Sequence, residues 1–169
     1  MSQVRSSDGL VAVTGASGHI GSHVVLALVK RGYTVRACVT DESKPEKTAH
    51  LRAMNSGVYP GRVELRTGNL LEQGSYDAIF AGCAAVMHGG TPMGYANLNK
   101  PRQIYDGAVN GTTNVLESVK RAGSARRVVY TSSFSAIAHP APPGYVFSEK
   151  DWASSSHPCR DCPTPSPSH

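Results

Sequence analysis

The run Leu10-Val11-Ala12-Val13-Thr14-Gly15-Ala16-Ser17-Gly18-His19-Ile20-Gly21 joins an apolar strand pattern to three glycines spaced three residues apart. This order predicts a buried strand, a tight turn and the start of a helix. Gly15 allows the turn, Gly18 allows a diphosphate to approach the backbone, and Gly21 allows the helix to pack against the strand. Free amides and the positive end of the helix dipole would then face the phosphates. The segment therefore predicts a dinucleotide site, and the alternative is a structural turn that binds nothing.

The rest of the chain alternates strand patterns with helix patterns. Ile20, Val24, Val25 and Leu28 recur on one face of the first helix, which ends at Arg31-Gly32. Further strands are predicted at 33–39, 61–66, 84–88 and 127–131, and further helices at 45–54, 75–81 and 103–122. The residues of the last helix that we expect to face inward are Val109, Val115, Leu116 and Val119. This alternation predicts an α/β fold of the Rossmann type, with a doubly wound parallel sheet in the order 3-2-1-4-5 and a ligand crevice between strands 1 and 4.

Composition indicates one folded domain with polar ends. The chain has 169 residues, and 40% of them are hydrophobic, which is enough for one core. We expect a flexible N-terminus over 1–8, a nucleotide-binding domain over 9–152, and a disordered tail over 153–169, where Pro and Ser alternate without aliphatic residues.

Charge and cysteine usage exclude several classes of protein. The formal net charge of +5 comes from scattered basic residues, so we expect no nucleic-acid partner. The N-terminus has no apolar signal core, and no stretch approaches 18 apolar residues, so we expect no membrane partner. Four cysteines in a chain of this size do not indicate a disulfide framework, and the expected location is cytoplasmic.

Five motifs in order carry a family resemblance. They are Thr14-Gly15-x-x-Gly18-x-Ile20-Gly21, Gly68-Asn69-Leu70, His88-Gly89-Gly90-Thr91-Pro92-Met93, Val109-Asn110-Gly111-Thr112-Thr113-Asn114-Val115-Leu116 and Arg127-Val128-Val129-Tyr130-Thr131-Ser132-Ser133. Over about residues 9 to 152, the chain resembles an extended short-chain dehydrogenase/reductase, closest to the dihydroflavonol reductase and cinnamoyl-CoA reductase group. The resemblance implies an NAD(P)-binding domain of an enzyme that reduces a carbonyl or aldehyde by hydride transfer from NADPH. Complete members of the family continue into a smaller substrate lobe, so the resemblance also implies a C-terminal truncation.

The catalytic residues of the family match only in part. Ser133 matches the serine that polarises the substrate carbonyl, and the alternative is that Ser132 and Ser133 cap the loop after a strand. The family's acid is a tyrosine followed four residues later by lysine, and no tyrosine of this chain has that partner. Tyr145 is followed at that spacing by Glu149, with Lys150 one residue late. We therefore expect little activity from this chain alone, and the alternatives are a non-catalytic dinucleotide-binding module, which could pair with a full-length homologue, or an unstable product.

The cofactor is predicted to be NADP, with NAD possible. Asp41 lies 20 residues after Gly21, where a carboxylate can accept from an NAD ribose hydroxyl or cap a surface helix. Arg36, Lys44 and Lys47 can offer charge to a 2′-phosphate, and Lys47 matches a basic position of the family.

The candidate site can be stated residue by residue. The catalytic candidate is Ser133, and no metal is expected, because the single Cys159-x-x-Cys162 pair lacks a scaffold. The candidate cofactor-binding residues are Gly15, Ser17, Gly18, His19, Ile20, Gly21, Arg36, Asp41, Lys47, Asn69, Leu70, Gly89, Gly90, Thr91, Thr131 and Ser132.

Overall fold

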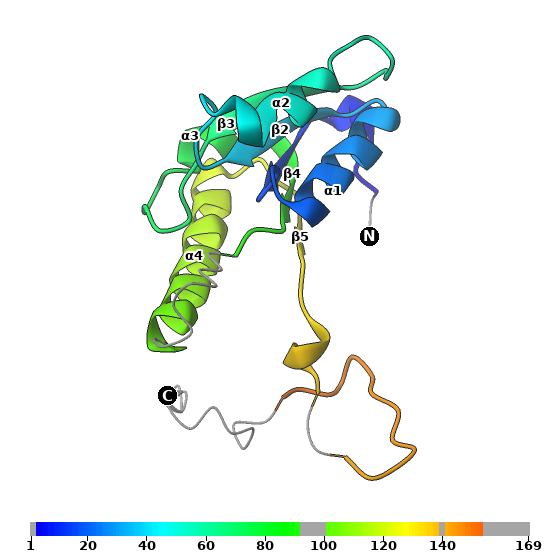
Figure 1. Ribbon diagram of the computed structural model, residues 1–169, viewed down its shortest axis with the longest axis vertical. Coiled ribbons are helices and arrows are strands. Elements are labelled where there is room, and N and C mark those ends of the chain that lie inside the picture. Colours follow the sequence, from blue (N-terminus) through cyan, green and yellow to red (C-terminus); the bar gives the residue numbers. More distant parts are fainter. Residues whose placement is uncertain (1–2, 92–100, 139–140, 154–169) are drawn as a thin grey trace.

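Five parallel strands form one sheet with helices on both faces, as Figure 1 shows. The computed structural model describes residues 3–91, 101–138 and 141–153. The strand order is β3-β2-β1-β4-β5, which confirms the Rossmann-type fold and the order expected from the sequence. Because the chain reverses its winding direction at β1, the carboxyl ends of β1 and β4 lie side by side at a topological switch point.

The observed elements lie within one or two residues of most of the predicted ones. They are a short 3-10 helix η1 (Ser6–Asp8), β1 (Leu10–Thr14), α1 (His19–Lys30), β2 (Thr34–Val39), α2 (Pro45–Ala53), β3 (Arg62–Thr67), α3 (Asp77–Phe80), β4 (Cys83–His88), α4 (Pro101–Ala122), β5 (Arg127–Tyr130) and a second 3-10 helix η3 (Phe134–Ala136). None of the helices within the described residues is both long and apolar enough to cross a membrane.

The core is divided by the sheet into two clusters. Val13 and Ala37 belong to the cluster that includes Val25 and Val29 of α1. Their neighbours Ala12 and Cys38 belong to the other cluster, with Phe80 and Val115 of α3 and α4. Because successive residues of a strand point to opposite faces, adjacent strand residues pack into different helical layers, which is the arrangement that runs of buried apolar residues predict.

The buried stripe of α1 differs from the predicted one. Gly21, Val25 and Val29 are its buried residues, and they recur every four positions. Val24 and Leu28 are partly buried against the same cluster, but Ile20 is 56% exposed. Ile20, which the sequence analysis placed on the same helical face as Val24, Val25 and Leu28, is therefore exposed, and the buried stripe begins at Gly21.

The inward face of α4 is also narrower than predicted. Val115 is buried and Val119 is partly buried, but Val109 and Leu116 are 44% and 48% exposed. The expectation that Val109 and Leu116 face inward is wrong, because α4 contacts the domain through the side that carries Val115, Asn114 and Ser118.

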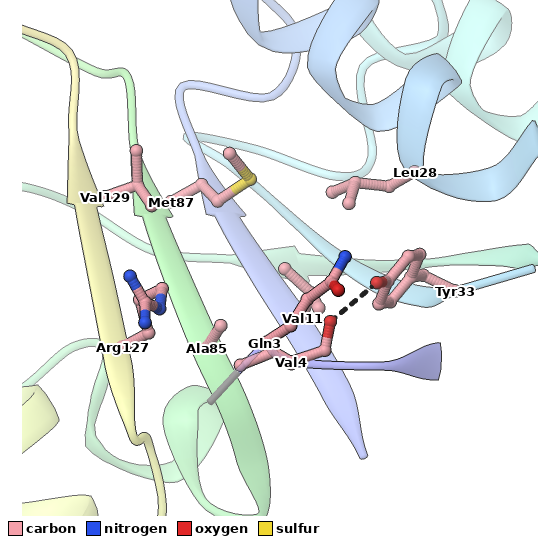
Figure 2. Close-up of a pocket in the computed structure, with 9 residues that line it drawn as sticks. All are labelled: Gln3, Val4, Val11, Leu28, Tyr33, Ala85, Met87, Arg127 and Val129. Atoms are coloured by element: carbon pink, nitrogen blue, oxygen red, sulfur yellow. Dashed lines mark hydrogen bonds between the residues drawn. The ribbon is translucent and has the colours of Figure 1, made fainter. Parts of the chain in front are cut away.

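The segment that the sequence predicts to be flexible makes defined contacts where it is described. Asp8 pairs with Arg126 at 2.9 Å, and the Tyr33 hydroxyl donates to the Val4 carbonyl at 2.8 Å. Val4 and Gln3 border a hollow of about 430 Å³ on the α1 side of the sheet, over β1, β4 and β5 (Figure 2). Its floor is formed by Val11, Ala85, Met87 and Val129, so it is largely apolar and offers only Arg127 as a charged group.

Candidate functional site

A crevice lies at the carboxyl ends of four strands. Its volume is about 300 Å³, at the lower end of the range of about 300–1,000 Å³ that ligand pockets occupy. Its walls come from the β1–α1 turn, the ends of β2 and β3, and the residues after β4. The lining residues are Gly15, Ser17, Cys38, Val39, Thr40, Gly68, Asn69, Leu70, Leu71, Tyr76, Gly90 and Thr91. This is the edge of the sheet at which the strand order reverses, where open α/β sheets bind their ligands.

Two glycine backbones meet at the centre of the crevice. Gly15 has a φ of 67°, a conformation that side chains disfavour. A methyl group on Gly15 would lie 2.8 Å from Cα of Gly90, so the turn after β1 touches the segment after β4 through bare backbone. Gly21 stands against the same turn, where a methyl group would overlap the Gly15 carbonyl oxygen. The glycine spacing read from the sequence therefore builds a tightly closed turn.

The backbone amides of the first turn of α1 follow directly after the glycine turn at the end of β1. Gly18 is the N-cap, and no side chain among the described residues caps it. The first amides of an α-helix have no partner within the helix, and together with the helix dipole they favour an anion. His19 and Ile20 are exposed on this turn.

The wall at the end of β3 is built around a buried aromatic residue. Tyr76 is 2% exposed, stacks on Phe80, and lies so close to Gly68 that a methyl group there would come within 2.6 Å of its ring. Burial raises the pKa of the Tyr76 hydroxyl, so it stays protonated. Our sequence analysis missed Tyr76 as a lining residue, although its spacing to Ile79 and Phe80 is a helical signal of burial.

Cys38 also lines the crevice, but its thiol is not activated as a nucleophile. Burial raises the pKa of its thiol to about 12, so the nucleophilic thiolate is not formed near neutral pH. Cys38 and Cys83 are free, buried cysteines. Within the described ranges, no three His, Cys, Asp or Glu side chains gather into a group that could hold a metal ion. Cys159 and Cys162 lie outside the described residues.

The charged candidates near β2 have their own partners. The carboxylate of Asp41 accepts from the amide and the hydroxyl of Ser43 and lies 3.7 Å from Lys44, and these bonds lower the pKa of Asp41. Arg36 donates from Nη1 to the carbonyls of Ile79 and Ala81 at 2.6 and 2.7 Å, so it caps the end of α3. The structure therefore does not bring Arg36 to the crevice.

Lys47 is exposed on α2, and it is not among the residues that line the crevice. Its side chain is exposed to solvent in the first turn of the helix. The structure places it as a surface cation on the element that follows Asp41.

A buried polar pair joins β1 and β4 directly below the crevice. Thr14 Oγ1 and His88 Nδ1 share a hydrogen bond at 2.6 Å, and both residues are at most 2% exposed. The His88 ring also contacts the ring of Tyr130 on β5. Burial lowers the pKa of His88 below its ordinary value of 6.5, so the imidazole is neutral and ties the ends of two strands together.

This pair predicts a pH dependence of stability. Because the folded pKa of His88 is lowered, the unfolded chain binds more protons as the pH falls through about 6.5, and the folded state loses stability. Between about pH 7.5 and 5.5, we expect the thermal unfolding temperature to fall less steeply in His88→Asn than in the natural chain. His50→Asn is the matched control, because His50 is exposed on α2. Equal slopes in both variants would contradict the assignment.

The segment after β5 carries the catalytic candidate. Thr131 donates its amide to the His88 carbonyl at 2.9 Å and lies beside Gly89. Ser132 and Ser133 are exposed. Ser133 is the N-cap of η3, and its Oγ accepts from the Ser135 amide at 3.2 Å. The capping interaction considered for this serine is thus present, and it leaves the hydroxyl proton available as a donor.

The predicted cofactor residues form one central group with several outliers. Those that line the crevice together are Gly15, Ser17, Asn69, Leu70, Gly90 and Thr91. Gly18, His19, Ile20 and Gly21 form the adjoining helix start, and Gly89 and Thr131 adjoin it at the ends of β4 and β5. The remaining predicted residues are not among those that line the crevice, and they are Arg36, Asp41, Lys47 and Ser132.

The profile described as the NAD dependent epimerase/dehydratase family matches residues 11–161. A cinnamoyl-CoA reductase of Medicago truncatula is 42% identical over 135 residues, which cover 79% of this chain and 40% of that protein. A dihydroflavonol 4-reductase of Hordeum vulgare is 34% identical over 148 residues, which cover 86% of this chain and 40% of that protein. The chain thus spans about 40% of the length of these relatives.

Two solved structures of reductases are also similar to this chain. The yeast methylglyoxal/isovaleraldehyde reductase Gre2, crystallised with NADPH, superposes with a TM-score of 0.73 at 25% identity, over 90% of this chain and 46% of that one. Vestitone reductase of alfalfa (Medicago sativa) superposes with a TM-score of 0.66 at 24% identity, over 86% of this chain and 43% of that one. The second likeness concerns the fold alone.

Proposed function

Because this chain belongs to the NAD dependent epimerase/dehydratase family, we propose that it is the NADP(H)-binding domain of a carbonyl reductase. The observation that carries the proposal is the crevice at the switch point, where bare backbone at Gly15 and Gly90 forms the floor. A side chain at Gly15 would collide with the Gly90 backbone, so the close approach of the two segments that shapes this crevice requires glycine. The residues present therefore fit a dinucleotide.

Each wall of the crevice has a separate task in this proposal. The amides at the start of α1, next to Gly18, bind the diphosphate. Asn69 and Leu70 flank the adenine, and Thr91 with Gly90 borders the path toward the nicotinamide. When bound, the dinucleotide supplies the hydride that reduces a carbonyl carbon.

The state of Asp41 supports NADP over NAD. An acidic residue after β2 selects NAD when its carboxylate is free to accept from the ribose hydroxyls. Here that carboxylate already accepts from Ser43 and lies beside Lys44. With Lys44 paired to Asp41, the exposed Lys47 on α2 adds positive charge after the same strand, where it can favour a 2′-phosphate. The NADPH in the yeast Gre2 structure points the same way.

A phenolic or flavonoid carbonyl substrate is part of the proposal, and the names of the similar proteins support it. The similar proteins include a cinnamoyl-CoA reductase and dihydroflavonol reductases. In the proposal, the Ser133 hydroxyl donates a hydrogen bond to the carbonyl oxygen and polarises it. Its Oγ still accepts the hydrogen bond from the Ser135 amide. Thr131 and Ser132 lie between this serine and the end of β5 and border the nicotinamide side.

A second candidate function is a dinucleotide-binding module without turnover. Two observations favour it: the absence of a Tyr-x-x-x-Lys pair from the sequence, and the exposed apolar side chains Tyr105, Val109 and Leu116 on α4. Pairing with a full-length homologue would cover such a face. Both candidates require dinucleotide binding, and they differ in turnover.

Titration with NADPH and NADH tests the shared proposal. We expect saturable NADPH binding by calorimetry, with NADH at least about tenfold weaker, because the 2′-phosphate adds a charge-assisted contact. Asp41→Ala should leave NADH affinity unchanged, because the Asp41 carboxylate is engaged with Ser43 and Lys44. A folded sample that gives no heat and no thermal protection with either dinucleotide would refute the proposal. A selective loss of NADH binding in Asp41→Ala would instead assign Asp41 to the ribose.

A further inference from the structure

The amide of Asn114 on α4 is used entirely by one loop. Asn114 is 6% exposed although it is polar. Its Nδ2 donates to the carbonyls of Leu70 and Glu72 at 3.2 and 2.6 Å and lies 3.5 Å from the Asn69 carbonyl. Its Oδ1 accepts from the Gly74 amide at 2.9 Å. One side chain therefore satisfies three backbone groups within the segment 69–74, and it lies close to a fourth.

This segment is the wall of the crevice at the end of β3. Asn69, Leu70 and Leu71 line the crevice, and Leu71 is 65% exposed on the outer side. The inner side rests on α4 at Gly111, where a methyl group would lie 3.2 Å from Cβ of Leu70. A methyl group on Gly90 would in turn lie 3.5 Å from Cδ1 of Leu70. Contacts thus run from α4 through Leu70 to the floor of the crevice.

We propose that Asn114 is a positioning residue that sets this wall before the dinucleotide arrives and thereby raises dinucleotide affinity without contacting the ligand. The inference rests on the proposed function and adds a residue to it. Buried carbonyls and amides that lose their partner become costly, and an exposed loop released from them gains conformational freedom. A dinucleotide that binds a released loop must order it again, which weakens binding.

The test is a comparison of Asn114→Asp with Asn110→Asp. Both changes replace an amide by a carboxyl on α4, but Asn110 is exposed. At about pH 8, the carboxylate of Asn114→Asp cannot donate to the loop carbonyls, and we expect NADPH binding about tenfold weaker than in the natural chain. At about pH 5, a carboxyl that faces carbonyl oxygens takes up a proton and can donate again, so part of the affinity should return. Asn114→Ala should be weakened at both pH values, because alanine cannot donate.

Parallel measurements separate this effect from other titrations. Glu72, Glu117 and the Asp77–Arg121 ion pair are the charged groups on the elements around Asn114. They are present in the natural chain and in Asn110→Asp, so their titration cancels in the comparison. Recovery at low pH that occurs only in Asn114→Asp supports positioning, since a loss of packing alone would not be restored by a proton.

Hydrogen exchange at the Gly74 amide tests, without any ligand, whether Asn114 holds the segment 69–74. We expect faster exchange at about pH 8 in Asn114→Ala, which offers this amide no acceptor, with Asn110→Asp unchanged. Equal exchange in all four proteins, or NADPH affinity in Asn114→Asp equal to that of the natural chain, would overturn the inference. Failure of the natural chain to bind NADPH would refute the proposed function instead, and the exchange data would still decide whether Asn114 holds the loop.

Discussion

Gly21→Ala should strongly weaken dinucleotide binding and destabilise the domain. A methyl group at this position overlaps the Gly15 carbonyl oxygen and lies 2.7 Å from the Gly15 carbonyl carbon and 2.9 Å from Cα of Ala16. All three atoms belong to the backbone of the turn, so no side chain can move aside. The helix must shift away from the turn, and we expect a loss of about 3 kcal/mol in the free energy of unfolding, measured by chemical denaturation.

Gly21→Ala should also lower the affinity for NADPH. Displacement of α1 moves the amides beside Gly18 relative to the crevice, and a misplacement of about 1 Å at a reacting or binding group costs about 100-fold. We therefore expect NADPH affinity to fall at least about 100-fold, measured by calorimetry at a temperature where the variant is still folded.

Gly18→Ala is the matched control for Gly21→Ala. Its added methyl group meets only the Gly15 carbonyl oxygen, at 3.3 Å, and the backbone of Gly18 is already extended. As a change at the N-cap, it should cost about 1 kcal/mol or less. If Gly21→Ala proved as stable as Gly18→Ala and bound NADPH as tightly as the natural chain, the close contact between α1 and the β1–α1 turn would not have the role assigned to it.

The features that could be predicted from the sequence are those encoded in residue type. Glycine spacing fixed the turn at Gly15 because positive φ and close backbone approach leave few alternatives. Runs of apolar residues located the strands, and right-handed crossovers then allowed only a few sheet orders. The bounds of the helices followed closely: α2 spans Pro45–Ala53, and the prediction was 45–54.

The features that could not be predicted depend on tertiary partners. Arg36 has a long side chain that several acceptors could satisfy, and the fold brings the carbonyls of Ile79 and Ala81 to it across more than 40 residues of sequence. Asn114 and Ser118 are buried on α4, which apolar periodicity cannot anticipate because hydrogen bonds replace apolar contacts there. Val109 and Leu116 failed as core predictions because an apolar stripe does not specify which part of it is covered.

Incubation of this chain with NADPH and a phenolic or flavonoid carbonyl should give turnover at least about 100-fold below that of a family member that carries the Tyr-x-x-x-Lys pair, because loss of a general acid costs about 10²–10⁴-fold. The natural candidate for a replacement acid is Tyr145. Its hydroxyl donates to the carboxylate of Asp151, and this bond raises the pKa of Tyr145. A neighbouring lysine would have the opposite effect, since a positive charge stabilises the phenolate.

The local structure around Tyr145 argues against rescue by Lys150. Residues 141–153 contain turns and extended segments but no helix among the described residues, so the two side chains do not share a helical face. Asp151 is also held by the amide and the hydroxyl of Ser148, which fixes the carboxylate that Tyr145 contacts. The phenol is thus positioned as a structural donor of this segment.

The decisive measurement follows NADPH oxidation and NADPH binding in the same sample. Tight binding with no oxidation would support a dinucleotide-binding domain whose proton donor lies outside this chain. Measurable oxidation that disappears in Tyr145→Phe would contradict the prediction, because the bond to Asp151 would then have been broken in the working state. Oxidation that disappears in Ser133→Ala but persists in Tyr145→Phe would also contradict it, and would show that polarisation of the carbonyl by one hydroxyl is enough for hydride transfer without the missing acid.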